Sequence, residues 1–572
     1  MIFRSFLPFS AVSVLAAALL TIASPLRAQS SVLMDTMTAE LNRASANLGK
    51  DAKDSQQPPY YISYAAHDLH TVVVAAEQGG IVASSADHSR SADIVVRVGD
   101  PALDNTHGPH RSSAIHTVPL PLDDDPKAIA RALWRGTNSE YGNALQTWLQ
   151  VKTETQVRAK EEDTSPDFSK DAPPPSAAAQ PVTPSSIDRD QWNARIRALS
   201  VIFRDYPHVY SNLTIFTVLD DTNYFVSSEG ARIVTPRQLA RIVVLATTRA
   251  ADGMDLFRAQ TFEAKTADGL PPQKELEAAV RALGASLEQL RTAPVTEPFD
   301  GPAVLSGRAS AVFFHEVLGH RLEGQRQRGD EEGQTFTKDL GKPILPSFLS
   351  VADDPTLATF DGTWLSGYYT YDDEGQRARK VELIQDGILK TFLMSRLPIA
   401  SVSTSNGHGR SQAGHMPTGR QGNLIVTSTK TVPESDLRKM LIDEAKKQNK
   451  PYGLYFEDIS SGFAVTTRNA PQAFQVIPLV VYRVYTDGRP DELVRGVSIV
   501  GTPQAALSRI VATGDKSEVF NGECGAESGT IPVSAIAPSM LVSEIETQRQ
   551  QQGTARPPIL PPPTAINSGE GR

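Results

Sequence analysis

The stretch Ala311-Val-Phe-Phe-His315-Glu316-Val-Leu-Gly-His320 places two imidazoles and a carboxylate in an otherwise apolar segment. The apolar run predicts a buried helix over 308–318. The two histidines and Cys524, which is the only cysteine of the chain, together offer three ligands for zinc. Three protein ligands leave a fourth position open for water, which is typical of a catalytic zinc site rather than a structural one.

The spacing of the two histidines restricts how they can share a metal. His315 and His320 are five residues apart, whereas a separation of four places both side chains on one helical face. On a regular α-helix five residues leave the two rings about 140° apart. A shared metal therefore requires a π-bulge, or a helix that ends near Gly319 so that His320 returns from the next turn. Gly319 favours the second alternative, because glycine tolerates a left-handed conformation.

Cys524 has three interpretations from its residue type alone. A lone cysteine cannot form an internal disulfide, so it is a buried inert thiol, one half of an intermolecular bridge, or a metal-bound thiolate. The flanking glycines, Gly522 and Gly525, favour a tight turn at this position over a strand interior.

Residues 1–28 have the pattern of a secretory signal, with Arg4 before a short apolar core over Ala11–Ile22 and a cut expected after Ala28. We therefore expect an exported protein, periplasmic in a Gram-negative bacterium, with no membrane span after signal removal. The formal net charge of −9 argues against nucleic acid as the main partner.

Composition and hydrophobic pattern predict an α+β fold. An N-terminal α/β layered domain with a mostly antiparallel sheet precedes a β-rich C-terminal domain that carries the metal helix. Residues 160–186 are rich in Lys, Glu, Pro, Ala and Ser and predict a disordered insertion, and the Gln/Pro-rich tail is also expected to be disordered. The expected boundaries are 1–28 for the signal, 31–159 and 187–300 for the two parts of the N-terminal domain, 160–186 for the insertion, 301–547 for the catalytic domain and 548–572 for the tail.

The histidine motif, followed by Arg321-Leu-Glu-Gly324, resembles the signature of the TldD/PmbA family of zinc metallopeptidases. The resemblance extends over about residues 33–546, and four further segments resemble family segments in the family's order: Phe225-Val-Ser-Ser-Glu-Gly230, Asp372-Asp-Glu-Gly375, Asn406-Gly-His-Gly-Arg410 and Cys524-Gly-Ala-Glu-Ser-Gly-Thr-Ile-Pro-Val533.

This resemblance implies zinc as the cofactor, with His315, His320 and Cys524 as its ligands. It also implies hydrolysis of peptide bonds in unfolded polypeptides or small peptides. The expected assembly is a homodimer, or a heterodimer with an inactive TldE/PmbA-like relative. We expect the peptide to bind as an added strand beside the C-terminal sheet.

Four further residues receive candidate roles. Glu316, next to a ligand, is the candidate general base. Glu323 is either a partner of a ligand imidazole or a solvated carboxylate. His408 and Arg410 either bind substrate or support their loop. The alternative function is a peptide-binding or peptide-maturation scaffold whose metal is purely structural.

Overall fold

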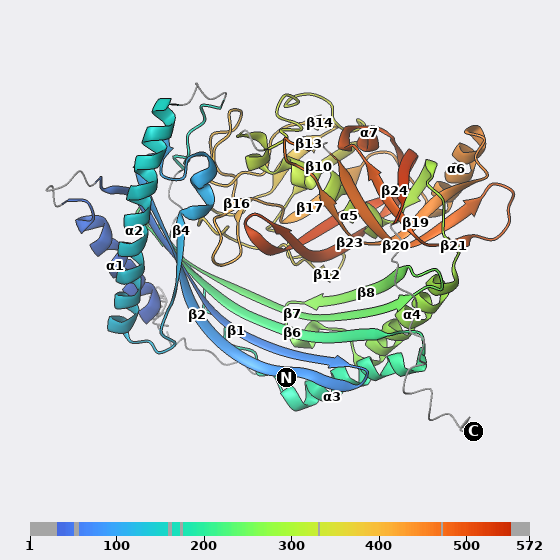
Figure 1. Cartoon of the computed structure of the whole chain (residues 1–572), viewed down its shortest axis with the longest axis horizontal. Coiled ribbons are helices and arrows are strands. Elements are labelled where there is room, and N and C mark those ends of the chain that lie inside the picture. Colours follow the sequence, from blue (N-terminus) through green and yellow to red (C-terminus); the bar gives the residue numbers. More distant parts are fainter. Residues whose placement is uncertain are drawn as a thin grey trace, which may run out of the picture.

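The computed structural model describes residues 31–50, 57–157, 163–171, 176–329, 332–470 and 473–550. The expected signal over 1–28 and the tail beyond residue 550 lie outside the described residues. A long curved antiparallel sheet forms the N-terminal part, and a β-rich C-terminal domain lies on its concave side (Figure 1). The predicted α+β class, with its antiparallel N-terminal sheet and β-rich C-terminal domain, is confirmed.

The N-terminal sheet consists mainly of very long strands. They run in the order β2-β1-β6-β7-β8, all antiparallel. β1 continues without a break through residues 67–70, which pair with β2 on one side and with β6 on the other. The bounds are β1 Pro59–Glu77, β2 Gly80–Asp100, β3 Leu103–Asp104, β4 Ile115–Pro119, β5 Ala177–Ala178, β6 Ser211–Ser227, β7 Arg232–Arg249 and β8 Asp255–Ala264.

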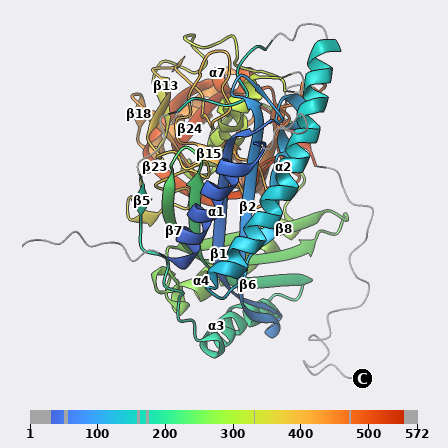
Figure 2. The same cartoon turned by 90° about the vertical axis from the view of Figure 1, so that its left-hand side faces the viewer.

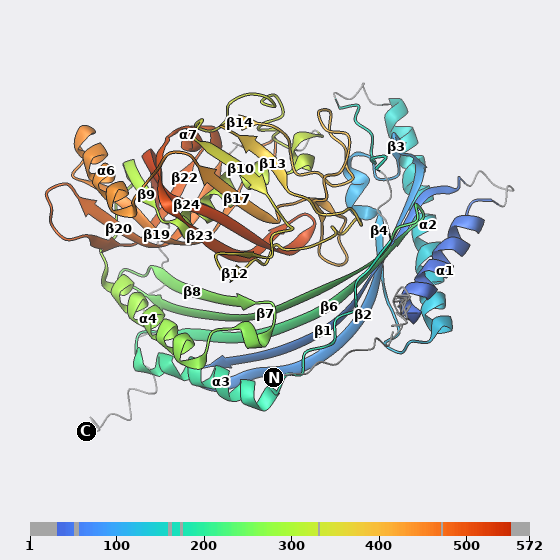
Figure 3. The same cartoon turned by 180° about the vertical axis from the view of Figure 1, so that it is seen from behind.

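Two pairs of helices cover the convex face of this sheet at its two ends. Even-numbered residues of β1 face the helices: Tyr64 and Ala66 pack against α1 and α2, and Val74 and Ala76 pack against α3 and α4. Figure 2 shows α1 and α2 side by side across one end, and Figure 3 shows α3 and α4 beneath the other. The bounds are α1 Val32–Asn47, α2 Pro126–Val157, α3 Arg189–Val201 and α4 Gln273–Thr292.

The concave face of the sheet contacts the C-terminal domain. Odd-numbered residues of β1, including Tyr61 and His67, line a small cavity together with Glu374 and Ser411. Arg396 joins the two parts: it is 1% exposed, and its Nη1 lies 2.5 Å from Glu229 Oε2. A buried charge is tolerated when it is paired in this way, so Arg396 fixes how the domains dock.

The segment expected to be a disordered insertion is ordered over its described residues, 163–171 and 176–186. Phe168 is buried, with its ring 4.7 Å from that of Tyr61 and 3.9 Å from the Arg396 guanidinium carbon. β5 pairs with β7, and Ser185 N donates to Asp220 Oδ2 at 2.7 Å. The prediction failed there because one aromatic anchor and a few backbone hydrogen bonds order a segment whose average composition is polar.

The C-terminal domain is built on a twelve-stranded sheet. β24 pairs with both β22 and β9, so β9, β19, β20, β22 and β24 close into a ring that holds the main core. The strands are β9 Asp300–Leu305, β10 Leu349–Asp353, β11 Thr359–Phe360, β12 Thr363–Trp364, β13 Val381–Gln385, β14 Ile388–Leu389, β15 Gly409–Arg410, β16 Thr418–Gly419, β17 Asn423–Ser428, β18 Thr431–Val432, β19 Tyr452–Ala464, β20 Phe474–Tyr485, β21 Glu492–Val494, β22 Val497–Gly501, β23 Ile510–Ala526 and β24 Gly529–Arg549.

Three α-helices accompany these strands: α5 Gly307–Val317, α6 Glu434–Lys447 and α7 Pro503–Ser508. α5 packs against β24, β19 and β23, and most of its residues are buried in the main core. α6 covers the outer side of the ring, where Leu437 and Leu441 contact Val304 and Leu541. The expected catalytic domain over 301–547 corresponds to the stretch from β9 to β24, which ends two residues later at Arg549.

One buried carboxyl in α2 predicts an unusual dependence of stability on pH. Glu140 is 1% exposed, its Oε2 accepts a long hydrogen bond from Asn143 at 3.4 Å, and burial raises its pKa from 4.5 to about 7. The folded state thus favours the neutral carboxyl, so stability falls as pH rises from about 4.5 to about 7. We expect Glu140→Gln to stabilise the protein at pH 8, by about 3 kcal/mol at most, and to have little effect at pH 4.5.

Urea denaturation of wild type and Glu140→Gln at both pH values measures this effect. Glu154→Gln is the matched control, because Glu154 lies on the same helix and is 41% exposed. A Glu140→Gln variant with no greater gain at pH 8 than the control would contradict the assignment.

Candidate active site

The last turn of α5 presents His315 and Glu316. The helix begins after Ser306, whose side chain accepts a hydrogen bond from Ala309 N at 3.1 Å. α5 ends at Val317, and a 3₁₀ turn over Gly319–Leu322 follows. The helix therefore ends before His320, which is the second of the two alternatives considered for the five-residue spacing.

Gly319 serves this turn for a steric reason rather than a conformational one. It is absent from the glycines with positive φ. A Cβ at Gly319 would instead lie 2.0 Å from Gln421 Oε1, far inside van der Waals contact. Glycine is thus needed because the Gln421 side chain, whose Nε2 donates to the His315 carbonyl at 3.4 Å, passes directly over the turn.

Cys524 meets the two histidines from a distant strand. Its Sγ lies 3.3 Å from His315 Nε2 and 3.3 Å from His320 Nε2, and all three residues are buried. Cys524 lies within β23, paired with Ile531 of β24, so the tight turn suggested by the neighbouring glycines is wrong. Both glycines are strand residues: a Cβ at Gly522 would lie 2.8 Å from the Phe520 ring, and one at Gly525 would meet only Thr530 Oγ1, at 3.7 Å.

The donor set fits zinc. In a tetrahedral site an imidazole nitrogen and a thiolate sulfur on one zinc are about 3.6 Å apart, close to the two observed separations. Burial raises the pKa of the Cys524 thiol, but His320 and His315 outweigh burial and hold that pKa well below its usual range. Burial likewise lowers the pKa of His320, but Cys524 and Glu323 raise it well above its usual value. The lowered pKa of Cys524 favours the thiolate, which is the form of cysteine that binds zinc.

Glu323 supports His320 from behind. It is fully buried, and its Oε1 lies 3.1 Å from His320 Nδ1, so the other ring nitrogen faces Cys524. Burial opposes ionisation of Glu323, but the charge of His320 overrides it and lowers the pKa of Glu323 to about 2. The solvated alternative for Glu323 is therefore wrong. A carboxylate behind a ligand imidazole is the usual arrangement in zinc sites, whereas His315 Nδ1 has no such partner among the described residues.

Sequence reasoning missed two buried arginines that hold this site together. Arg420 donates from Nη2 to the Cys524 carbonyl at 2.8 Å, and its Nε lies 3.4 Å from Glu323 Oε1. Arg321 donates to the carbonyls of Glu316 and Val317, which closes the C-terminal end of α5, and its burial lowers its pKa to about 10. The sequence gives only a weak signal for these roles. Arg420 follows a glycine and Arg321 follows a histidine of the motif, and neither neighbour indicates a buried arginine.

His408 and Arg410 lie behind the site rather than on its surface. His408 is fully buried, with Nε2 3.2 Å from Asp353 Oδ1. Arg410 is 3% exposed and donates to the carbonyls of Gln421 and Pro532. Neither side chain is open to a peptide, so of the two roles expected for them the geometry favours support of the loop.

Glu316 is the carboxylate beside the Cys–His cluster. Its Oε2 lies 3.8 Å from His320 Nε2, and its side chain is 11% exposed. Among the described residues no hydrogen bond to this carboxylate is found. A Cβ at Gly462 of β19 would lie 2.8 Å from Glu316 Cγ, so the absence of a side chain there leaves space for the carboxylate.

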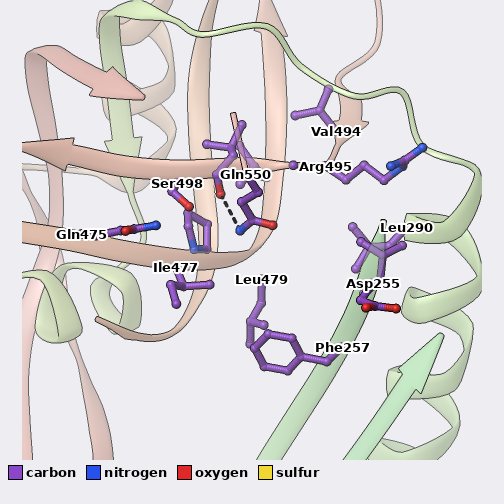
Figure 4. Close-up of a pocket in the computed structure, with 15 residues that line it drawn as sticks. Asp255, Phe257, Leu290, Gln475, Ile477, Leu479, Val494, Arg495, Ser498 and Gln550 are labelled. Atoms are coloured by element: carbon purple, nitrogen blue, oxygen red, sulfur yellow. Dashed lines mark hydrogen bonds between the residues drawn. The ribbon is translucent and has the colours of Figure 1, made fainter. Parts of the chain in front are cut away.

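A cavity of about 320 Å³ lies on the other side of β20 from this cluster (Figure 4). Gln475 and Ile477 line it together with Phe257 of β8 and Leu290 of α4. Val476, between them in β20, points the opposite way into the core shared with α5. This cavity at the domain boundary is therefore separate from the Cys–His cluster.

Residues 299–549 match the family model of the PmbA/TldA metallopeptidase C-terminal domain. A metalloprotease of Archaeoglobus fulgidus is 30% identical over 42% of this chain and 51% of its own length. A zinc metalloprotease TldD homologue of Saccharolobus solfataricus is 26% identical over 43% of this chain and 51% of its own length. These matches thus span about half of each relative.

The structure of TldE from Thermococcus kodakarensis aligns with a TM-score of 0.58, covering 90% of this chain and 100% of that one, at 12% identity. The buried Cys–His cluster lies within residues 299–549, the part of the chain that is similar to metallopeptidases. The C-terminal part of the chain, residues 299–549, is therefore a domain of the TldD/PmbA type. No helix among the described residues has the length and apolar character to cross a membrane.

The contact between Glu323 and His320 predicts a specific loss of metal affinity. Glu323→Gln removes the charge that holds the His320 ring, so we expect zinc affinity to fall by about 10- to 100-fold. Competition with a chromogenic chelator measures it. Glu332→Gln is the control, because Glu332 also pairs with Arg326 but does not contact His320. Equal affinities in the two variants would argue against this role.

Proposed function

We propose that this chain is a zinc-dependent peptidase that hydrolyses peptide bonds in unfolded polypeptides or small peptides. The observation that carries the proposal is the convergence of His315, His320 and Cys524 from two distant segments, with the Glu316 carboxylate 3.8 Å from one ligand nitrogen. The match of residues 299–549 to a metallopeptidase C-terminal domain supports it.

Each residue near the cluster then has a chemical task. Zinc held by the two Nε2 atoms and the thiolate would supply Lewis acidity and lower the pKa of a water molecule toward neutrality. Glu316 would accept the proton of that water and deliver it to the leaving amine. Glu323 keeps His320 in the orientation that points Nε2 at the cluster.

The strand next to Glu316 offers a place for an extended peptide. β19 pairs with β9 only over Leu454–Phe456, because the chain turns into α5 after Leu305. Beyond that point, residues 460–464 of β19 are paired on one edge by β20, with no strand described on the other edge. We propose that substrate adds as a strand along this edge, which passes Gly462 beside Glu316 and the half-exposed Phe463.

We further propose export and association. The signal pattern over 1–28 supports an exported, periplasmic protein. We propose either a homodimer or a heterodimer with an inactive TldE/PmbA-like relative, as the family resemblance of the sequence implies. Light scattering of the purified chain, alone and mixed with such a relative, distinguishes these assemblies.

The function is tested by incubating the zinc-loaded protein with a mixture of unfolded proteins and identifying new termini by mass spectrometry. We expect new termini that disappear when zinc is removed by a chelator. Peptides that bind but remain uncut would favour the scaffold with a structural metal. The products would also give the cleavage preference.

A further inference from the structure

The convex face of the N-terminal sheet carries a polar strip that neither helix pair covers. It lies in the middle of β1 and β2, between the part packed on α1 and α2 and the part packed on α3 and α4 (Figures 1 and 3). Asp68 and His70 have the even numbering that places them on this face of β1. On β2, His88 is the register partner of His70, and Arg90 is the partner of Asp68.

The side chains of this strip are already held together. The rings of His70 and His88 are stacked, with centroids 3.8 Å apart and an interplanar angle of 13°. His88 Nε2 lies 2.6 Å from Asp68 Oδ1, and Arg90 Nη2 donates to Asp68 Oδ2 at 2.6 Å. One oxygen of Asp68 and one nitrogen of each histidine all lie within 4.8 Å of one another, and all three residues are partly exposed.

We propose that Asp68, His70 and His88 form a second binding site, specific for a divalent transition metal such as zinc. Two imidazoles and a carboxylate are a common three-ligand set for zinc, and solvent can supply the remaining position because all three residues are partly exposed. Two such ligand atoms on one zinc are about 3.3 Å apart. The Asp68 and His88 atoms therefore need to separate by less than about 1 Å. The two stacked rings also need to rotate apart, because an imidazole binds a metal in its own ring plane. Side-chain rotation on a partly exposed surface allows both movements.

The charges around the strip favour a cation. Asp220 of β6 is the register partner of His70, and Asp124 lies 2.9 Å from Arg90 Nη1. Together with Asp68, these groups place three carboxylates and one guanidinium around two imidazoles. Arg90 pairs with Asp68 and Asp124, and one guanidinium does not balance three carboxylates. The remaining negative charge favours the binding of a dication.

This site would be separate from the Cys–His cluster. The cluster belongs to the C-terminal domain, which lies against the concave face, whereas the strip is on the convex face. A metal here would join β1 and β2 near the middle of their length. It would bind the folded chain only, because the ligands come from two strands, and so would stabilise it in proportion to metal concentration.

Zinc bound per chain after equilibrium dialysis tests the proposal, with His70→Gln and His88→Gln as the test variants. His67→Gln is the matched control, since His67 is on the same strand but on the concave face, 3.0 Å from Asp221. We expect two zinc ions for wild type and the control, and one for each test variant. In a Cys524→Ser background, zinc should still raise the melting temperature, and adding His70→Gln should abolish that rise.

Equal zinc content in His70→Gln, His88→Gln and His67→Gln would overturn the proposal, as would a Cys524→Ser protein that zinc does not stabilise. Magnesium, which prefers oxygen ligands, should not replace zinc in either measurement. Cys524→Ser tests the Cys–His cluster and His70→Gln tests the second site. If one of the two sites does not bind zinc, binding at the other can still be measured.

Discussion

Glu316→Gln is expected to lower peptide hydrolysis by about 100-fold or more while zinc stays bound and the fold is unchanged. Glutamine keeps the shape of the side chain and its 3.8 Å approach to His320 Nε2, but it cannot accept the proton of an attacking water. The loss should appear in kcat rather than in KM, because the carboxylate acts on the transition state and not on peptide binding along β19.

The measurement combines initial rates on a fluorogenic peptide with zinc content of the same sample. Glu518→Gln is a suitable control, because Glu518 accepts from Arg308 N at the opposite end of the same helix. A zinc-loaded Glu316→Gln protein with full activity would contradict a general-base role and require another group for proton transfer. Activity lost together with zinc would instead show that Glu316 acts on the metal.

Cys524→Ser is expected to weaken zinc binding at the His315–His320–Cys524 cluster by more than about 100-fold and to abolish hydrolysis with it. A hydroxyl is a poor replacement for a thiolate on zinc. The loss of a ligand should also weaken zinc binding more than Glu323→Gln does, because Glu323 only contacts a ligand. In the wild type, bound zinc should also protect the thiol, so that chelation both exposes it to alkylation and stops the reaction.

Zinc per chain and the alkylation rate, each with and without chelator, measure this prediction. Ile531→Val is the matched control: Ile531 is the cross-strand partner of Cys524 and belongs to the same small apolar cluster, so its truncation reports a packing loss without a ligand loss. If the serine variant keeps full zinc and activity, Cys524 is only a buried apolar side chain.

Local sequence patterns predicted the parts of this site that depend on short-range structure. The apolar run before His315 specified the buried helix, and the restricted choice of donors pointed to Cys524 as the third ligand. Such a helix can be predicted from its own segment, because helix periodicity and capping involve residues within a few positions of each other.

Patterns failed where the chain closes on itself over long distances. The hairpin of β23 and β24 carries Cys524, and β24 completes the ring by pairing with β9, far earlier in the sequence. No periodicity within a strand identifies its partner, since pairing is decided by many weak cross-strand contacts acting together. The glycines that flank Cys524 suggested a turn, because the sequence near them does not show that β24 pairs with this segment.

The sequence by itself determined the candidate ligand types, the helix that carries His315 and the α+β class, because each follows from residue chemistry and local periodicity. Only the tertiary structure decided how His320 turns back after Val317, why Gly319 must lack a side chain beneath Gln421, and how Arg420 ties Cys524 to Glu323. These features depend on side chains brought together from three separate segments, whose approach is set by the packing of the closed sheet.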